Sequence, residues 1–273
     1  MSYKDKLMKF LGRLSREEVE ELSEIFDWLT SDPGLLYHEL SKYTPKWSVV
    51  RRFTGKSYMS PGLLKKMSGV KVKLPKPNPK LFKLSFGEAI IKRRSIRGFK
   101  DQALDLETLS TLLYYSAGLR EYEWGYPMRM FPSAGALQPL ELYLVVSNIR
   151  DLDNGIYHYE VHDHSLVLIK KGSFNWELCR YCLDQRHVLE APVNICISIV
   201  YPRSASKYSW RAYRYVNMDL GHLGQNIYLV STALGLGTCA IGAFEDDPIN
   251  RLLGLDGYNE FIALVYPVGI PRK

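Results

Sequence analysis

The stretch that most constrains the fold covers residues 131–146 and reads FPSAGALQPLELYLVV. Its second half, from Leu140 to Val146, has the pattern of a buried strand. Its first half is small and polar: Ser133 can cap a helix through its side-chain oxygen, and Gly135, which has no Cβ, lets another group approach the backbone. The stretch predicts a tight loop that leads into a core strand, with free N–H groups at a helix start that suit an anionic or flat polar ligand. An ordinary corner between a loop and a strand has the same pattern, and taken alone the stretch favours that plainer interpretation.

The composition bounds the kind of protein. With 273 residues, of which 46% are hydrophobic and 24% charged, the chain suits one large domain or a domain with a smaller appendage. The formal net charge of +7 suits phosphate ligands or acidic surfaces, but no nucleic-acid-binding motif is recognised. Four cysteines do not make a disulfide framework in a chain of this length, and neither a signal peptide nor a membrane-spanning run is found. We expect a soluble cytoplasmic protein with no nucleic-acid, membrane or metal partner.

Residues 1–80 are predicted to form a helical appendage and a strap, ahead of a main domain over 81–273. The expected elements are a helix over 15–29 that opens with the capping box SREE and stops at Asp32-Pro33-Gly34, a helix over 37–43, a helix that starts at Ser60-Pro61, and an extended, proline- and lysine-rich strap over 70–81.

The main domain is predicted to be α+β, because strands and helices are mixed without strict alternation. The expected helices follow a capping box at Ser85 and an Asp105 cap, cover 174–183 and 248–253, and include a long one over 211–236. The expected strands cover 140–146, 155–161, 165–170, 192–201, 239–244 and 260–268, and 120–130 is expected to be a loop.

Three arginines and a serine stand together after the Ser85 helix, at Arg93, Arg94, Ser95 and Arg97. A phosphate needs several charge-assisted donors, and arginine offers them in a fork geometry. A solvated basic helix end, which suits the helix dipole, explains the same residues. Both interpretations stay open on this cluster alone.

Two further sites have a structural and a chemical interpretation. Lys207-Tyr208 precedes the long helix and is either plain surface or, if it lines a dry pocket where a lysine loses its charge more easily, a base. Gly242 and Ala243 are small residues at a predicted strand end, where a flat ring could approach the backbone. Cys179 and Cys182 are interpreted as half-buried helix residues rather than a redox pair.

Taken in order, these pieces resemble a known family. They are RRSxR at 93–97, PSAGALQPLELY at 132–143, GIYHY at 155–159, Lys-Tyr at 207–208, YRYxxxDxGHxGQN at 213–226 and ALGLGxCxIGAF at 233–244. This order looks like the FMN-dependent nitroreductase superfamily, and within it the SagB/ThcOx-type dehydrogenases, the azoline oxidases of peptide maturation. The likeness covers about 86–269, and Tyr37-His38-Glu39 with Lys42 is similar to an N-terminal element of that group.

The resemblance implies a nitroreductase-like α+β flavoprotein, with a central mixed or antiparallel sheet flanked by helices, that works as a homodimer with FMN at the subunit interface. Lys207 and Tyr208 match the Lys-Tyr pair that serves azoline oxidation, and the loop over 132–135 would reach the flavin from the other subunit. Ile241, Gly242 and Ala243 would lie along the ring system, with a backbone N–H near N5. The implied FMN-binding residues are Arg93, Arg94, Ser95, Arg97, Pro132, Ser133, Ala134, Gly135, Ile241, Gly242, Ala243 and Arg272.

Three functions follow from these observations. The first is an FMN-dependent oxidoreductase that passes hydride between its substrate and flavin N5, with azoline dehydrogenation in a modified peptide as its specific form. The second is an NAD(P)H-dependent nitroreductase or quinone reductase on the same fold; ordinary nitroreductases, however, have asparagine at the position of Ala136 and tryptophan at that of Leu140. The third is a flavin- or small-molecule-binding protein without turnover.

Overall fold

The computed structural model describes Ser15, residues 33–42 and residues 58–272. The chain divides into two compact units, 1–56 and 57–273. In the first unit, helix α3 (Pro33–Leu40) begins at the proline that was expected to end a preceding helix, since a proline is tolerated in a first helical turn. The helix predicted over 15–29 lies outside the described residues apart from Ser15, and the domain boundary predicted at residue 80 stays a prediction.

The second unit is built on a seven-stranded antiparallel sheet. Its strand order is β1-β6-β5-β4-β7-β9-β8, and every ladder in it is antiparallel. The strands are β1 (Lys71–Lys73), β4 (Leu140–Val146), β5 (Gly155–Glu160), β6 (Ser165–Lys171), β7 (Val193–Val200), β8 (Gly237–Thr238) and β9 (Glu260–Gly269). The opening stretch of the sequence therefore supplies β4, which lies between β5 and β7 in the middle of the sheet.

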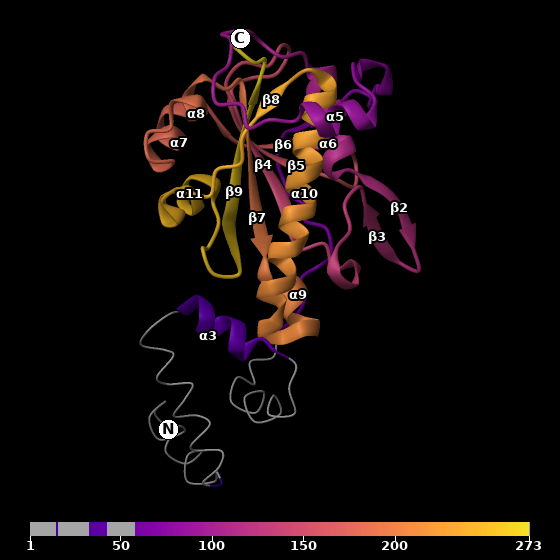
Figure 1. The fold of residues 1–273 in the computed structure, drawn as a ribbon, viewed down its shortest axis with the longest axis vertical. Coiled ribbons are helices and arrows are strands. Elements are labelled where there is room, and N and C mark those ends of the chain that lie inside the picture. Colours follow the sequence, from indigo (N-terminus) through magenta and orange to yellow (C-terminus); the bar gives the residue numbers. More distant parts are fainter. Residues whose placement is uncertain (1–14, 16–32, 43–57, 273) are drawn as a thin grey trace. The chain divides into compact units, whose positions relative to one another are not determined.

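Helices cover both faces of the sheet (Figure 1). One face carries α5 (Phe86–Lys92), α6 (Leu106–Ala117) and α10 (Ala212–Leu234), and the other carries α7 (Asn175–Tyr181), α8 (Arg186–Glu190) and α11 (Asp246–Leu253).

Strand β4 is buried on both faces, and its side chains alternate between two cores. Leu142 and Leu144 pack in a core with residues of α6 and α10, whereas Tyr143 and Val145 pack in a second core with residues of α7 and α11. A strand buried on both faces reads as a continuous apolar run, and this is why β4 was predictable. The α+β fold that the sequence predicts is confirmed, and its sheet is of the antiparallel kind.

The helix starts predicted at Ser85 and Asp105 are confirmed, and the long helix ends at a glycine. The Ser85 box is formed, since Ser85 N–H donates to Glu88 Oε2 over 2.9 Å and Glu88 N–H to Ser85 Oγ over 3.4 Å. Asp105 Oδ1 accepts the Thr108 N–H over 2.7 Å and opens α6. Gly235 ends α10 in the left-handed region with φ of 77°, where glycine carries no Cβ penalty.

Two predictions of local structure were wrong because distant groups or unusual turn residues decide the backbone. No helix starts at Ser60, since the Lys65 N–H of that segment donates to Glu141 Oε1 instead of to a helical carbonyl. The expected loop over 120–130 is a hairpin of β2 (Leu119–Glu123) and β3 (Tyr126–Arg129). Trp124 and Gly125 both have positive φ, as in a type I′ hairpin turn, although tryptophan is not a usual residue there.

Two further differences bear on the site. Helix α9 (Tyr201–Tyr208) follows β7 directly and was not predicted, so Lys207 and Tyr208 end this helix rather than lead into α10. The prediction of a strand over 239–244 was wrong: β8 already ends at Thr238, and within that range only Ile241 pairs, in a single bridge with Val265. Ala240, between β8 and Ile241, gives its N–H to the Tyr228 hydroxyl over 2.8 Å, outside any ladder.

Within 33–42 and 58–272, no helix is long and apolar enough to cross a membrane, and no group of histidine, cysteine, aspartate or glutamate side chains could hold a metal ion. The four cysteines are free and buried, so Cys179 and Cys182 are not a disulfide pair, and both are more deeply buried than the half-buried positions expected.

Candidate functional site

The predicted phosphate cluster gathers around one tyrosine of α10. The Arg93 guanidinium lies 5.3 Å from the centre of the Tyr228 ring, and Ser95 Oγ lies 3.1 Å from the Tyr228 hydroxyl. The same hydroxyl accepts the Ala240 N–H, so Tyr228 connects the arginine cluster to the segment that leads into Ile241. The sequence analysis missed Tyr228; its only signal is that a tyrosine on a packed helix needs a partner for its hydroxyl.

The arginines of this cluster keep their charge unpaired. Arg94 and Arg97 are exposed, and Arg94 Nη1 donates to the carbonyls of Ile91 and Arg93 over 2.8 Å each. In the described part of the chain, no carboxylate lies within ion-pair distance of Arg93, Arg94 or Arg97. Donors without an anion are what a phosphate site requires.

Arg272 lies beside this cluster but is already engaged. Its Nη2 lies 2.9 Å from Glu190 Oε2, and its Nε and Nη2 donate to the Phe99 carbonyl over 3.1 and 2.8 Å. Together with residues of the 99–102 and 147–148 segments, this pair lines a cavity of about 370 Å³. A role of Arg272 in phosphate binding would require it to share its guanidinium with Glu190.

The segment after β8 offers a small, open edge. Ile241 is buried and its N–H donates to the Val265 carbonyl over 2.8 Å, so this N–H is not available to a ligand. Gly242 and Ala243 are exposed, and a Cβ on Gly242 would meet only a leucine methyl at 3.6 Å. A flat ring could therefore approach the backbone at these two residues. The neighbouring Ile241 is buried and holds the segment to β9 through its bonds with Val265.

The loop over 132–136 is held by a buried aspartate of α10. Ser133 Oγ donates to Asp219 Oδ2 over 2.7 Å and accepts the Gln138 N–H over 3.0 Å, and the Ala134 N–H donates to Asp219 Oδ1 over 3.1 Å. A short 3-10 helix (Ala134–Ala136) does start here with Ser133 at its N-cap, as predicted, but the Ser133 side chain makes no capping bond. The expected free N–H at this start was wrong for Ala134, because Asp219 accepts it. Burial raises the pKa of Asp219, and the hydrogen bonds from Ser133 and Ala134 act against that rise.

The same loop meets the predicted catalytic pair. Gly135 has φ of 63°, and a Cβ placed on it would lie 2.5 Å from the Tyr208 hydroxyl and 3.0 Å from Lys207 Nζ. Lys207 Nζ is 5.4 Å from the centre of the Tyr208 ring. Tyr208 is half-buried and Lys207 is exposed, so the described part of this chain does not itself supply the dry pocket that a base needs.

The two groups of predicted site residues lie at different heights along α10. Tyr228 contacts the arginine cluster, and Asp219 binds the loop. These two residues of α10 are nine positions apart, which at 1.5 Å per residue places them roughly 13 Å apart along the helix axis. In Figure 1, α5 and β8 lie toward one end of α10 and α9 lies at the other. Within one chain, therefore, the loop and the arginine cluster do not face a common small site.

Comparison with known proteins identifies the family of this chain. The profile of the nitroreductase family matches residues 90–270. The chain is 37% identical over 191 residues to MJ1384 of Methanocaldococcus jannaschii, provisionally described as a nitroreductase, which covers 70% of this chain and 93% of that protein. It is 29% identical over 167 residues to the trifolitoxin-processing protein TfxB of Rhizobium leguminosarum bv. trifolii, which covers 58% of this chain. The match spans 45% of TfxB, less than half of its length.

Two solved structures share the fold. A protein of Anabaena variabilis, provisionally described as a nitroreductase, superposes with a TM-score of 0.66 at 27% identity, over 85% of this chain and 49% of that one. A chain of the Escherichia coli microcin synthetase McbBCD complex, solved with truncated pro-MccB17 bound, superposes with a TM-score of 0.58 at 21% identity, over 98% of both chains.

Proposed function

This chain belongs to the nitroreductase family, and we propose from that premise that it is an FMN-dependent dehydrogenase of the SagB type that oxidises an azoline in a modified peptide. Its likeness to TfxB and to the McbBCD structure supports the SagB-like subgroup. The observation that carries the proposal is the contact of Lys207 and Tyr208 with Gly135. It joins the pair expected to move a proton with the loop expected to approach the flavin.

The residues present fit FMN. The exposed guanidinium groups of Arg94 and Arg97 have donors for a phosphate, and Ser95 adds a hydroxyl next to them. Gly242 leaves room for a flat ring, since a Cβ there would meet only one methyl group. The proposed phosphate, ribityl and pyrimidine contacts are therefore made by Arg93, Arg94, Ser95 and Arg97, and the ring contacts by Ile241, Gly242 and Ala243.

The proton step belongs to this chain's own residues. When bound, FMN supplies a two-electron acceptor for hydride. The neutral Lys207 amine, or the Tyr208 phenolate assisted by it, takes the acidic proton of the substrate. A peptide that lies over Gly135 would cover the Lys207 amine and keep water away from the proton transfer.

We propose a homodimer, which the resemblance to the family implies and with which the separation along α10 agrees. Because the loop over 132–135 and the arginine cluster of one chain are apart, each flavin site would combine the arginine cluster of one subunit with the loop of its partner. Lys207 and Tyr208 contact Gly135 and so would come from the same subunit as the loop. Light scattering should show a dimer, and a monomer that still binds FMN would contradict the shared site.

A second function, NAD(P)H-dependent reduction of nitro compounds or quinones, is favoured by the length of the match to MJ1384. The two functions differ in what reduces the protein. Mixed anaerobically with the reconstituted protein, an azoline-bearing peptide should bleach the flavin absorbance if the first function is right. Rapid bleaching by NADPH, with none by the peptide, would establish the second instead.

Variants make this test specific. Lys207→Ala and Tyr208→Phe should each slow peptide-driven bleaching about 10²–10⁴-fold, which is typical for loss of a general base, and leave FMN affinity nearly unchanged. Lys73→Ala, which removes an exposed lysine of the edge strand β1, is the matched control and should bleach at the wild-type rate. Wild-type rates in all three variants would show that Lys207 and Tyr208 are surface residues only.

A further inference from the structure

We propose that Arg203 and Glu141 form a positioning pair that holds Lys207 and Tyr208 against the loop over 132–138. The significance of the pair for catalysis rests on the function proposed above. Neither residue touches the reacting groups, and neither was singled out by the sequence analysis. The pair is therefore expected to act through the placement of α9.

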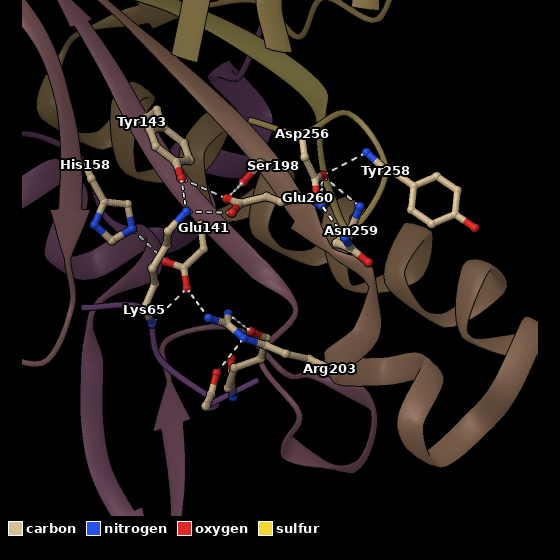
Figure 2. Close-up of polar contacts among 12 residues, drawn as sticks. Lys65, Glu141, Tyr143, His158, Ser198, Arg203, Asp256, Tyr258, Asn259 and Glu260 are labelled. Carbon is tan, nitrogen blue, oxygen red and sulfur yellow. Dashed lines mark hydrogen bonds and ion pairs between the residues drawn. The ribbon is translucent and has the colours of Figure 1, made fainter. Parts of the chain in front are cut away.

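The Arg203 guanidinium is fully used within the fold. It is 2% exposed, and its Nη2 lies 2.6 Å from Glu141 Oε1. Figure 2 shows how the two side chains point toward each other. Arg203 Nη1 donates to the Gln138 carbonyl and Nε to the Gly62 carbonyl, each over 2.8 Å. One side chain of α9 thus binds the start of β4, the end of the loop and the segment that precedes β1.

The Glu141 carboxylate is likewise bound by several groups of the protein. It is 1% exposed, and besides Arg203 it accepts the backbone N–H of Lys65 over 3.1 Å and His158 Nε2 over 3.0 Å (Figure 2). Burial alone would raise the pKa of Glu141, but the positive charge of Arg203 and the His158 hydrogen bond lower it to about 2. The carboxylate is therefore charged at neutral pH and offers Arg203 a fixed anion.

The pair connects directly to the candidate site. Arg203 and Lys207 are four residues apart in α9 and so lie on the same side of that helix. Gln138, whose carbonyl Arg203 binds, donates its N–H to Ser133 Oγ at the start of the loop. The guanidinium thus joins the helix that carries Lys207 to the loop that carries Gly135.

Stability alone does not account for such a pair. Taking two charges out of water costs several kcal/mol per ion, and apolar residues of similar volume are often as good or better for stability. What apolar residues cannot supply is a set of directed bonds from one group to three backbone or side-chain partners. Directed bonds fix the rotation and height of α9, and these decide where Lys207 Nζ lies.

The test compares two variants that disturb the same buried cluster from different sides. Arg203→Lys keeps the charge on α9 but loses the planar fork. Lys65→Met removes the ammonium that lies 2.6 Å from Glu260 Oε2 and 2.7 Å from the Tyr143 hydroxyl, and it leaves the Lys65 N–H and all of α9 in place. Both should lower the urea midpoint of the full-length protein, so stability by itself will not separate them.

The separating measurement is the rate at which acetic anhydride labels Lys207, followed by mass spectrometry. Arg203→Lys should change this rate about threefold or more, the effect that roughly 0.7 kcal/mol in the surroundings of the amine produces, and Lys65→Met should leave it at the wild-type value. A wild-type rate in Arg203→Lys, or an equal change in both variants, would overturn the proposal. If Arg203→Lys does not fold, Glu141→Asp, which keeps the anion but shortens its reach, replaces it with the same two outcomes.

A second readout keeps this inference distinct from the proposed function. If the wild-type protein is bleached by an azoline peptide, Arg203→Lys should lower kcat and leave FMN affinity unchanged, while Lys65→Met retains the wild-type kcat. An equal loss of kcat in both variants would count against a positioning role. If no azoline peptide bleaches the wild type, the proposed function fails, and the labelling rates still decide the positioning role.

Discussion

Arginines occur in this molecule in two opposite settings. Arg203 and Arg129 are buried and bound within the fold: Arg129 donates from Nε to the Ala117 carbonyl and from Nη1 to the Leu140 carbonyl, both over 2.7 Å. Arg94 and Arg97 are exposed at the end of α5, without a carboxylate partner in the described part of the chain. The residue type is the same, but the buried pair directs most of its donors to groups of the protein, with Arg129 Nη2 left without a partner among the described residues. Among those residues, the exposed pair makes local bonds only, from Arg94 Nη1 to the Ile91 and Arg93 carbonyls.

The contrast shows how structural and functional charges can be told apart. A buried guanidinium is expected to have most of its donors matched, because an unpaired buried charge costs far more than a surface one. An exposed arginine cluster carries no such requirement, and repulsion among its members adds nothing to folding. We infer that Arg203 and Arg129 hold β4 and α9 in place, and that the cluster at 93–97 exists to bind an anion.

The largest expected effect is on the buried side. Arg203→Met leaves the Glu141 carboxylate buried without its strongest partner, and breaking a buried ion pair from one side costs about 3–5 kcal/mol. Urea unfolding should show a loss of this size. A loss below about 1 kcal/mol would mean that the buried pair is not a fixed part of the fold.

A pH titration sharpens the same contrast. The pKa of Glu141 lies near 2 in the folded protein, below its ordinary value of 4.5, so its contribution is present above pH 4.5 and is lost as the pH falls toward 2. The wild type should lose on the order of 3 kcal/mol more over this range than Glu141→Gln, which has no proton to take up there. Asp219, whose pKa burial raises, is common to both proteins and cancels in the difference. Parallel acid limbs would contradict the assignment.

A smaller effect is expected where the loop meets α9. Gly135→Ala should cost about 1–2 kcal/mol for the left-handed backbone, and in addition it should displace the Tyr208 hydroxyl. Gly125→Ala is the matched control, because Gly125 also has positive φ but a Cβ there meets nothing within 4 Å. Peptide-driven flavin bleaching should fall only in Gly135→Ala; equal rates in the two variants would separate the loop from the catalytic pair.

The smallest effect is expected on the exposed side. Arg94→Ala and Arg97→Ala should change the free energy of unfolding by less than about 0.5 kcal/mol, the usual range for surface positions without a partner. The urea midpoints of these variants should match the wild type. A loss of more than about 1 kcal/mol would mean that the cluster supports the fold and is not reserved for a ligand.

The sequence predicted those parts of the fold that depend on neighbours in the chain. The hydrogen bonds of the Ser85 capping box and of the Asp105 cap each join residues three positions apart. Strand β4 was predictable from its nearly continuous run of apolar side chains. The helix expected at Ser60 failed because Lys65 gives its N–H to Glu141, which lies far along the chain. A pattern read over a short window has no access to such a partner.

The candidate site divides in the same way. The arginine cluster, the small-residue loop and the Lys-Tyr pair were each visible as residues, but their grouping was not. That Gly135 touches Lys207 and Tyr208, that Asp219 holds Ser133, and that Tyr228 joins Ser95 to Ala240 are all contacts between distant segments. Arg203 was missed because nothing in the short stretch between β7 and α10 marks a helix with a buried cation.

The proposed function depends most on the binding of FMN by the exposed arginines, and an equilibrium titration of FMN measures this directly. The wild type should bind FMN, and Arg97→Ala should bind it roughly 10- to 100-fold more weakly, as expected when a charge-assisted bond worth about 1.5–3 kcal/mol is removed. Arg150→Ala, an exposed arginine outside the cluster, should bind like the wild type. A wild-type protein that takes up no flavin, or equal affinities in all three proteins, would contradict the account.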